Sequence, residues 1–109
     1  MANIFMSEEA IRDLEQIGDY IAHQFKSPKS ALSIIRKIQE RINQLEDFPL
    51  IGTPLSAIVA TKTDYRFLGC GSYLAFYRSQ NDDVLIDRIL HAKQDYVFIL
   101  LGDINEKDV

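Results

Sequence analysis

The sequence has no tryptophan, one cysteine, three prolines and five glycines among its 109 residues. Cys70 cannot form an internal disulfide, and its place between two glycines with no base beside it predicts a structural thiol. No apolar run approaches the roughly 20 residues that a membrane-spanning helix needs, and the start lacks the pattern of a secretory signal. We therefore expect one domain over residues 1–109, in the cytoplasm and without contact to a membrane.

Cofactor and metal motifs are also missing. His23 and His91 are the two histidines, and neither belongs to a cluster with metal-ligand spacing. Gly69 and Gly71 lie between predicted strands, whereas a phosphate-binding glycine loop is followed by a helix. The sequence therefore predicts no cofactor and no bound metal.

The sequence has no long run of basic residues, and its charges are unevenly distributed along the chain. The formal net charge is −4, but the acidic excess lies in residues 1–24 and 94–109, while residues 25–93 are mildly basic. This distribution excludes a broad basic surface for nucleic acid and is compatible with a local phosphate site.

The first half of the chain predicts a short strand and two helices. Residues 3–6 form an apolar run, and Ser7 is typical of an N-cap for a helix over residues 8–25. Ser27 followed by Pro28 predicts the start of a second helix, which ends near residue 48 before a proline. The expected apolar stripes are Ile11, Leu14, Ile17, Ile21 and Phe25, and Ala31, Ile34, Ile35, Ile38, Ile42 and Leu45.

The second half predicts a loop and a β-meander. Residues 49–64 contain turn-forming residues without a period, and strand patterns follow over residues 65–69, 73–78 and 84–91. Residues 94–102 are compatible with a short helix capped by Gly102 or with another strand. We therefore expect an α+β fold, in which an antiparallel two-helix hairpin packs on a twisted antiparallel sheet beside a short C-terminal element.

Arginines in the predicted strands are the first candidates for a functional site. Arg66, Arg78 and Arg88 each lie in or at the end of an apolar strand, where a guanidinium needs an acidic partner or an opening to solvent. For Arg66 and Arg88, ion pairs and an anion site are equally supported, whereas Arg78 favours an ion pair at its turn. The acidic residues available to them are Asp64, Asp82, Asp83, Asp87 and Asp95.

His91, at the end of the last predicted strand, is the best candidate for proton transfer because histidine titrates near neutral pH. RNA supplies its own nucleophile, so histidine, arginine and tyrosine would suffice for a metal-free nuclease. Strand alternation, however, places Arg88 and His91 on opposite faces unless the strand ends or bulges. A local hydrogen bond to Asp87, Asp95 or the backbone is the competing interpretation of His91.

Motifs in the second half resemble a known toxin superfamily. They are the pair Tyr65-Arg66, the glycine hairpin 69–71, the strand end 76–78, and the run 88–91 before Asp95. Residues 8–22 and 48–54 are similar to the first helix and to the turn after the second helix of the same proteins. In this order and spacing, the sequence resembles the RelE/ParE superfamily of bacterial type II toxins over nearly the whole chain.

The resemblance implies a toxin that a cognate antitoxin neutralises, through an extended segment and an amphipathic helix. It also implies contact with promoter DNA only through the antitoxin. In the nuclease branch, Arg66 would match the arginine that stabilises the scissile phosphate, and His91 and Tyr96 would fall near the catalytic residues. Arg88, Arg78 and Lys62 would then bind the substrate phosphate.

The superfamily offers two activities. RelE-like and YoeB-like members cleave mRNA on the ribosome, whereas ParE-like members inhibit DNA gyrase without hydrolysis. The chain departs from the first group because it has Lys62 alone in place of a lysine-rich loop, and because of its acidic balance. Our first hypothesis is a metal-independent, ribosome-dependent mRNA endonuclease, and the alternative is a ParE-like gyrase inhibitor. A toxin that has lost its activity is a third option.

Overall fold

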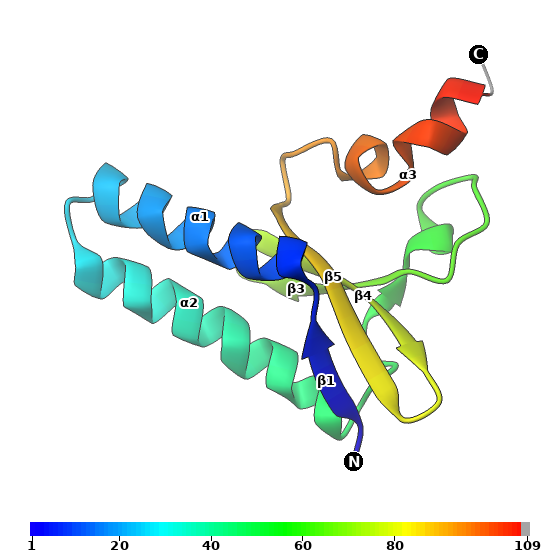
Figure 1. Ribbon diagram of the computed structural model, residues 1–109, viewed down its shortest axis with the longest axis horizontal. Helices are drawn as coiled ribbons and strands as arrows, with labels where there is room; N and C mark the ends of the chain where they lie inside the picture. The colour runs from blue at the N-terminus through cyan, green and yellow to red at the C-terminus, as the bar shows by residue number, and fades with distance from the viewer. Residues whose placement is uncertain (108–109) are drawn as a thin grey trace.

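The computed structural model describes residues 1–107, with side chains through Gly102. Helices pack on a five-stranded sheet with the strand order β1-β5-β4-β3-β2, which confirms the α+β prediction (Figure 1). The strands are β1 (Asn3–Met6), β2 (Thr53–Pro54), β3 (Arg66–Cys70), β4 (Tyr73–Gln80) and β5 (Asp83–His91). The helices are α1 (Glu8–Gln24), α2 (Pro28–Asn43) and α3 (Tyr96–Lys107), with short 3₁₀ helices η1 (Gln44–Glu46) and η2 (Leu55–Ala57).

The helical hairpin begins at two serine caps, as the sequence predicts. The Ser7 hydroxyl accepts from Ala10 N–H at 3.0 Å, and the Ser27 hydroxyl accepts from Ser30 N–H at 3.2 Å. The predicted stripe of α2 is largely correct, but that of α1 is wrong at its ends, because Ile11 and Phe25 are exposed. Figure 1 shows the reason for Phe25: the tip of the hairpin extends beyond the sheet, so residues there have no strand to pack on.

The sheet is mixed rather than wholly antiparallel. β1 pairs with β5 in parallel from Asn3↔Asp83 to Met6↔Ile86, while the other pairs are antiparallel. The register between β4 and β5 shifts after the pair Phe76↔Arg88, where a bulge is present. Because β1 ends at Met6, the edge of β5 beyond Ile86 has no neighbouring strand. The candidate site described below lies beside this free edge of β5.

Two apolar cores lie on opposite faces of the sheet. Tyr77 and Ile89 belong to the larger core beneath α1 and α2, whereas Phe76 and Leu90 belong to a second core with Leu101 of α3. The alternation of neighbours between the two cores follows the strand period. The sheet is therefore covered on both faces, and the C-terminal residues form a helix rather than a strand.

The predicted loop 49–64 contains β2 and η2, and it is attached to the sheet by buried polar contacts. Gly52 N–H donates to the hydroxyl of the fully buried Tyr77 at 2.9 Å. A Cβ at position 52 would lie 2.6 Å from that hydroxyl oxygen and 2.8 Å from the Phe67 carbonyl oxygen. Glycine is therefore required by close approach at this position.

The C-terminal element is helical, as one of the two alternatives for residues 94–102 predicts. Leu101 has a non-helical φ of −129°, so α3 consists of two helical segments joined by a kink just before Gly102. Within residues 1–107, none of the helices has the length and apolar character needed to cross a membrane.

Candidate functional site

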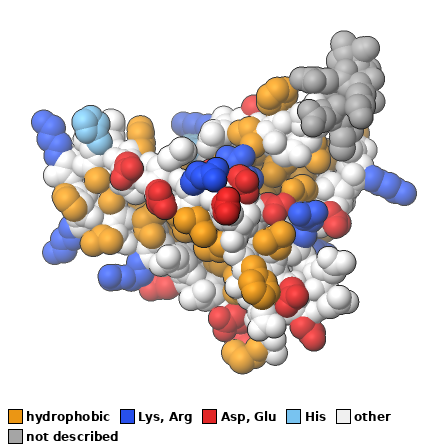
Figure 2. All heavy atoms as spheres, viewed as in Figure 1, with side chains coloured by type: hydrophobic (Ala, Val, Ile, Leu, Met, Phe, Trp, Pro, Cys, Tyr) orange, Lys and Arg blue, Asp and Glu red, His pale blue; other side chains and the backbone are white. Residues whose placement is uncertain are grey.

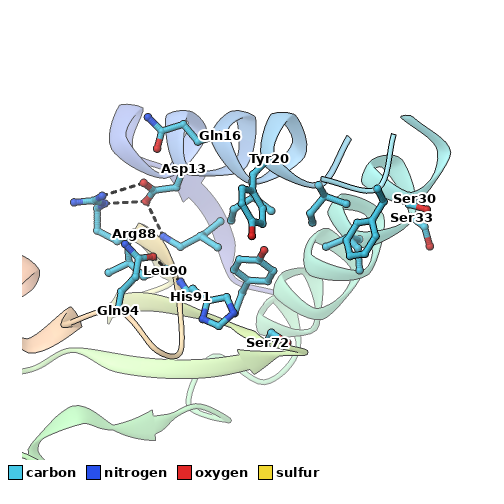
Figure 3. Close-up of a pocket in the computed structure, with 16 residues that line it drawn as sticks. Asp13, Gln16, Tyr20, Ser30, Ser33, Ser72, Arg88, Leu90, His91 and Gln94 are labelled. Atoms are coloured by element: carbon cyan, nitrogen blue, oxygen red, sulfur yellow. Dashed lines mark hydrogen bonds and ion pairs between the residues drawn. The ribbon is translucent and has the colours of Figure 1, made fainter. Parts of the chain in front are cut away.

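A groove of about 870 Å³ lies between the helical hairpin and the end of β5 (Figure 3). Its apolar lining comes from α1, α2 and β5 through Ile17, Ile21, Ile34 and Ile89. Aromatic side chains form its border, and two of them are largely exposed: Tyr20 at 62% and Phe25 at 66%. The other lining residues are Asp13, Gln16, Ser30, Ser33, Ser72, Tyr73, Arg88, Leu90, His91 and Gln94.

Asp13 and Arg88 form a bidentate ion pair at one end of the groove (Figure 3). Arg88 Nε donates to Asp13 Oδ2 at 2.8 Å, and Arg88 Nη2 donates to Oδ1 at 2.9 Å. The free edge of β5 contributes a third donor, because Ile89 N–H binds the same carboxylate at 2.9 Å. The hydrogen bond to Asp13 raises the pKa of the Arg88 guanidinium. Arg88 is therefore in an ion pair, with a partner that the sequence pattern did not indicate.

Arg88 and His91 both line the groove although strand alternation separates them. Arg88 pairs across the sheet with Phe76, yet its guanidinium reaches α1. This is possible because no strand flanks β5 beyond Ile86, so the long side chain bends around the open edge.

His91 is the last residue of β5 and is hydrogen-bonded to the turn that leads to α3. The His91 ring Nδ1 accepts from Lys93 N–H at 3.1 Å, and the His91 backbone N–H donates to Gln94 Oε1 at 2.8 Å. Its ring contacts Tyr73 edge-on, with centroids 5.3 Å apart. Burial raises the pKa of Tyr73. The local backbone bond expected as an alternative for His91 is present, and its catalytic role remains a prediction.

Arg66 lies far from this groove. Its Nη1 donates to the carbonyls of Gly52 at 2.8 Å and Leu50 at 3.4 Å, so it holds the loop before β2. Arg66 pairs with Tyr77 on one side of β4, whereas His91 pairs with Tyr73 on the other. These positions are about 13 Å apart along the sheet and about 10 Å apart across it. A single phosphate cannot contact both side chains in this arrangement.

Arg78 belongs to a third cluster. It pairs with Asp87 at 3.1 Å, rather than with the acids of its own turn, and its guanidinium lies over the Tyr65 ring at 5.1 Å. The Tyr65 hydroxyl donates to the same carboxylate. Burial and that hydrogen bond raise the pKa of Tyr65 to about 12. The ion pair expected for Arg78 is therefore present, with a different aspartate.

Tyr96 and Lys62 complete the set of predicted residues. Tyr96 is partly buried in the second core, with its ring 5.2 Å from that of Phe76, and so lies on the face opposite α1 and α2. Lys62 is exposed in the segment before β3. The structure brings Arg88 and His91 into one groove and places Arg66, Arg78, Tyr96 and Lys62 elsewhere.

The molecular surface carries no continuous basic area on the face in view. Figure 2 shows basic side chains scattered among acidic and apolar ones. Among the described side chains, residues 1–102, no three histidine, cysteine or acidic side chains are grouped so that they could hold a metal ion. The groove offers apolar surface, aromatic edges and one guanidinium, which suits contact with a polypeptide.

Sequence analysis missed three groove residues: Asp13, Tyr20 and Tyr73. Asp13 falls one turn before Ile17 on the buried face of α1, and an acid within an apolar stripe was the available signal. Tyr20 and Tyr73 carried no such signal, because their sequence positions do not show that a helix tip passes over a strand end.

Comparison with known proteins identifies the family. Residues 4–96 match the family described as "ParE toxin of type II toxin-antitoxin system, parDE". A solved structure described as "Chromosomal ParDE TA system from P. aeruginosa" has a similar fold, with a TM-score of 0.72 at 22% identity over 85% of this chain and 98% of that chain. No curated protein matches the sequence. The chain belongs to the ParE toxin family of type II toxin–antitoxin systems, within the RelE/ParE superfamily that its motifs resemble.

Proposed function

We propose that this toxin inhibits DNA gyrase by direct protein contact and is neutralised by a cognate antitoxin. The observation that carries the proposal is the separation of the three strand arginines, each of which is bound internally: Arg66 to carbonyls, Arg78 to Asp87 and Arg88 to Asp13. A nuclease needs several such groups around one phosphate. The ParE family match supports the same activity.

The mRNA endonuclease hypothesis keeps one supporting observation. Arg88 and His91 line one groove together with two tyrosines. For this groove to bind a scissile phosphate, Arg88 would have to leave Asp13 or share its remaining donors. The carboxylate of Asp13, at the same place, would repel the phosphate. The groove is therefore better suited to a polypeptide than to RNA.

The decisive experiment follows what stops first after the toxin is expressed in bacterial cells. A gyrase inhibitor arrests DNA replication and induces the DNA-damage response while transcripts remain intact. An endonuclease stops translation and leaves cut mRNA. Purified toxin added to gyrase and relaxed plasmid should also reduce supercoiling. Cut mRNA with normal supercoiling would contradict the proposal.

A His91→Gln variant separates the two activities at the level of one side chain. Glutamine retains an acceptor that can serve Lys93 N–H, but it cannot exchange a proton near neutral pH. We expect gyrase inhibition to persist. If His91 were a general acid or base, its loss would reduce RNA cleavage by about 10²–10⁴-fold.

A further inference from the structure

The segment 48–51, which follows η1, presents three large apolar side chains to solvent. Phe48 is 63% exposed, Leu50 is 61% exposed and Ile51 is 47% exposed. Single apolar side chains scattered over a surface are ordinary, but these three are gathered in one short segment. We call residues 48–51 the apolar turn, and none of them lines the groove between α1, α2 and β5.

The backbone of the apolar turn is ordered by its own hydrogen bonds. Phe48 N–H donates to the Gln44 carbonyl at 3.0 Å, and Ile51 N–H donates to the Phe48 carbonyl at 3.1 Å. A segment that is already held in one conformation loses little conformational entropy when a partner covers it. The apolar turn is therefore suited to act as a preformed contact.

Arg66 holds the apolar turn from the sheet. Its Nη1 donates to the Leu50 carbonyl at 3.4 Å and to the Gly52 carbonyl at 2.8 Å, so both bonds fix the backbone on either side of Ile51. The apolar side chains of the turn belong to neither of the two cores. The guanidinium therefore fixes the position of side chains that the cores of the toxin leave exposed.

Acidic side chains border the apolar turn. Asp47, which is exposed, directly precedes it, and Glu46 is one residue earlier. The Glu46 carbonyl accepts from Ala2 N–H at 2.8 Å and the Asp82 carbonyl accepts from Asn3 N–H at 2.8 Å, so β1 joins η1 and the acidic β4–β5 turn at one end of the molecule. Figure 2 shows acidic and apolar side chains gathered at this end, where the N-terminus lies in Figure 1. A complementary partner surface is apolar and has a basic border.

We propose that the apolar turn inserts into an apolar pocket of DNA gyrase bordered by basic side chains, and that Arg66 positions the turn for this contact. The inference rests on the proposed function and specifies its contact surface. Gyrase suits the charge of the toxin, because an enzyme that binds DNA carries basic surface for the phosphates. A protein with a net charge of −4 is attracted to such a surface.

A matched pair of leucine variants tests the contact in a supercoiling assay with gyrase and relaxed plasmid. Leu50→Ser should weaken inhibition at least about tenfold, because it removes apolar area that the pocket would bury. The control is Leu32→Ser, which has nearly the same exposure, 63%, and lies about 16 Å from the end of α2 that leads to the apolar turn. It should inhibit as the wild type does. Equal inhibition by the two variants would overturn the proposal.

A double-mutant cycle tests the positioning role of Arg66. Arg66→Ala frees the carbonyls of Leu50 and Gly52 and should weaken inhibition about tenfold through loss of the ordered turn. If Arg66 acts through the turn, the combined variant with Leu50→Ser should remain about tenfold weaker than the wild type, whereas independent effects would multiply to about 100-fold. A merely structural role of Arg66 predicts the second result, which would contradict the assigned role.

Charge reversal tests the basic border of the pocket. Asp47→Lys should weaken inhibition about tenfold at low salt, and the difference from the wild type should shrink as salt is added. The control is Asp19→Lys, which makes the same change in net charge at an exposed position of α1. An equal effect of the two variants would exclude a specific basic border.

The other possible occupants of the apolar turn are a second toxin molecule and the antitoxin. Sedimentation should show that wild-type toxin and Leu50→Ser have the same oligomeric state, and both should bind the cognate antitoxin equally well. A dimer that Leu50→Ser dissociates, or loss of antitoxin binding in this variant, would overturn the proposal. Wild-type toxin that leaves supercoiling unchanged would contradict the proposed function as well, whereas full inhibition by Leu50→Ser would refute the contact surface alone.

Discussion

At the scale of single residues, Asp13 illustrates how a buried carboxylate is stabilised. It is 7% exposed, and its two oxygens accept three N–H groups from β5. The carboxylate pays its desolvation cost through these bonds. Since Ile89 N–H has no neighbouring strand, Asp13 also replaces the strand partner that β1 would have supplied.

Replacement of Asp13 by alanine should destabilise the toxin by about 2–4 kcal/mol, because it leaves Arg88 and Ile89 N–H without an acceptor. The value is below that of a fully buried pair because Arg88 remains partly exposed. Urea unfolding measures the change. The control is Glu8→Ala, which removes an exposed pair with Arg12 and should cost less than about 0.5 kcal/mol. Similar losses in the two variants would refute the assigned role.

Cys70 should react slowly with thiol reagents in the folded toxin. Burial raises the pKa of its thiol from 9.0 to about 11, so the thiolate fraction at pH 8 falls about 100-fold. The neutral thiol is favoured in the folded state, and its contribution to stability is lost as the pH rises from 9 to 11. Alkylation by iodoacetamide at pH 8, with and without urea, measures the ratio, and equal rates would contradict the prediction.

Sequence could not identify the partners of Arg66 and Arg88, for a physical reason. Asp13 and Arg88 are brought together by the parallel pairing of β1 with β5, which no local pattern encodes. Arg66 binds backbone carbonyls, which every residue possesses, so composition gives no signal. In each case the partner lies in a segment distant in sequence, so only the folded structure shows the contact.

At the scale of elements, local sequence signals were sufficient to predict where β1 and α2 begin. The apolar run 3–6 matches β1, and the Ser27-Pro28 pair starts α2, because strand period and capping act between near neighbours. The ends of the apolar stripe in α1 were less predictable. Periodicity shows which side of a helix is apolar, but it does not show how far the sheet extends beneath it. Phe25 is exposed for that reason.

The helix α3 offers a test of whether the second core can unfold while the first core, beneath α1 and α2, stays folded. Leu101 is 7% exposed and anchors α3 in the second core with Phe76 and Leu90. Leu101→Ala should cost about 2 kcal/mol and increase amide hydrogen exchange in α3 at least about tenfold, while α1 stays protected. Ile99→Ala, at a 38% exposed position of the same helix, is the control and should change neither quantity. Faster exchange in α1 and α3 alike would show that the two cores unfold together.

At the scale of the whole molecule, the charge distribution gives little support for direct binding of nucleic acid. The net charge is −4, and basic side chains are scattered among acidic ones on the face in Figure 2. Non-specific affinity for nucleic acid depends on a basic surface that releases counterions. The toxin lacks that source of affinity on this face.

The purified toxin should therefore bind duplex DNA or RNA more weakly than about 10⁻⁴ M at physiological salt, with almost no dependence on salt concentration. Fluorescence anisotropy with a labelled duplex measures both quantities. Heat-unfolded toxin is the control for non-specific adsorption. Tight, strongly salt-dependent binding by the folded toxin would revive the endonuclease hypothesis.

The contact between Tyr77 and Gly52 restricts the order in which this sequence can evolve. A methyl group at position 52 would lie 2.6 Å from the tyrosine oxygen and 2.7 Å from its ring carbon Cε1, so loss of the hydroxyl alone would not make room for it. Even after that loss, the Phe67 carbonyl at 2.8 Å still obstructs the new atom. Two neighbours on different strands would have to yield in succession, and each step alone weakens the protein. We therefore expect glycine to persist at position 52, because a replacement would require changes at both Tyr77 and the backbone of Phe67.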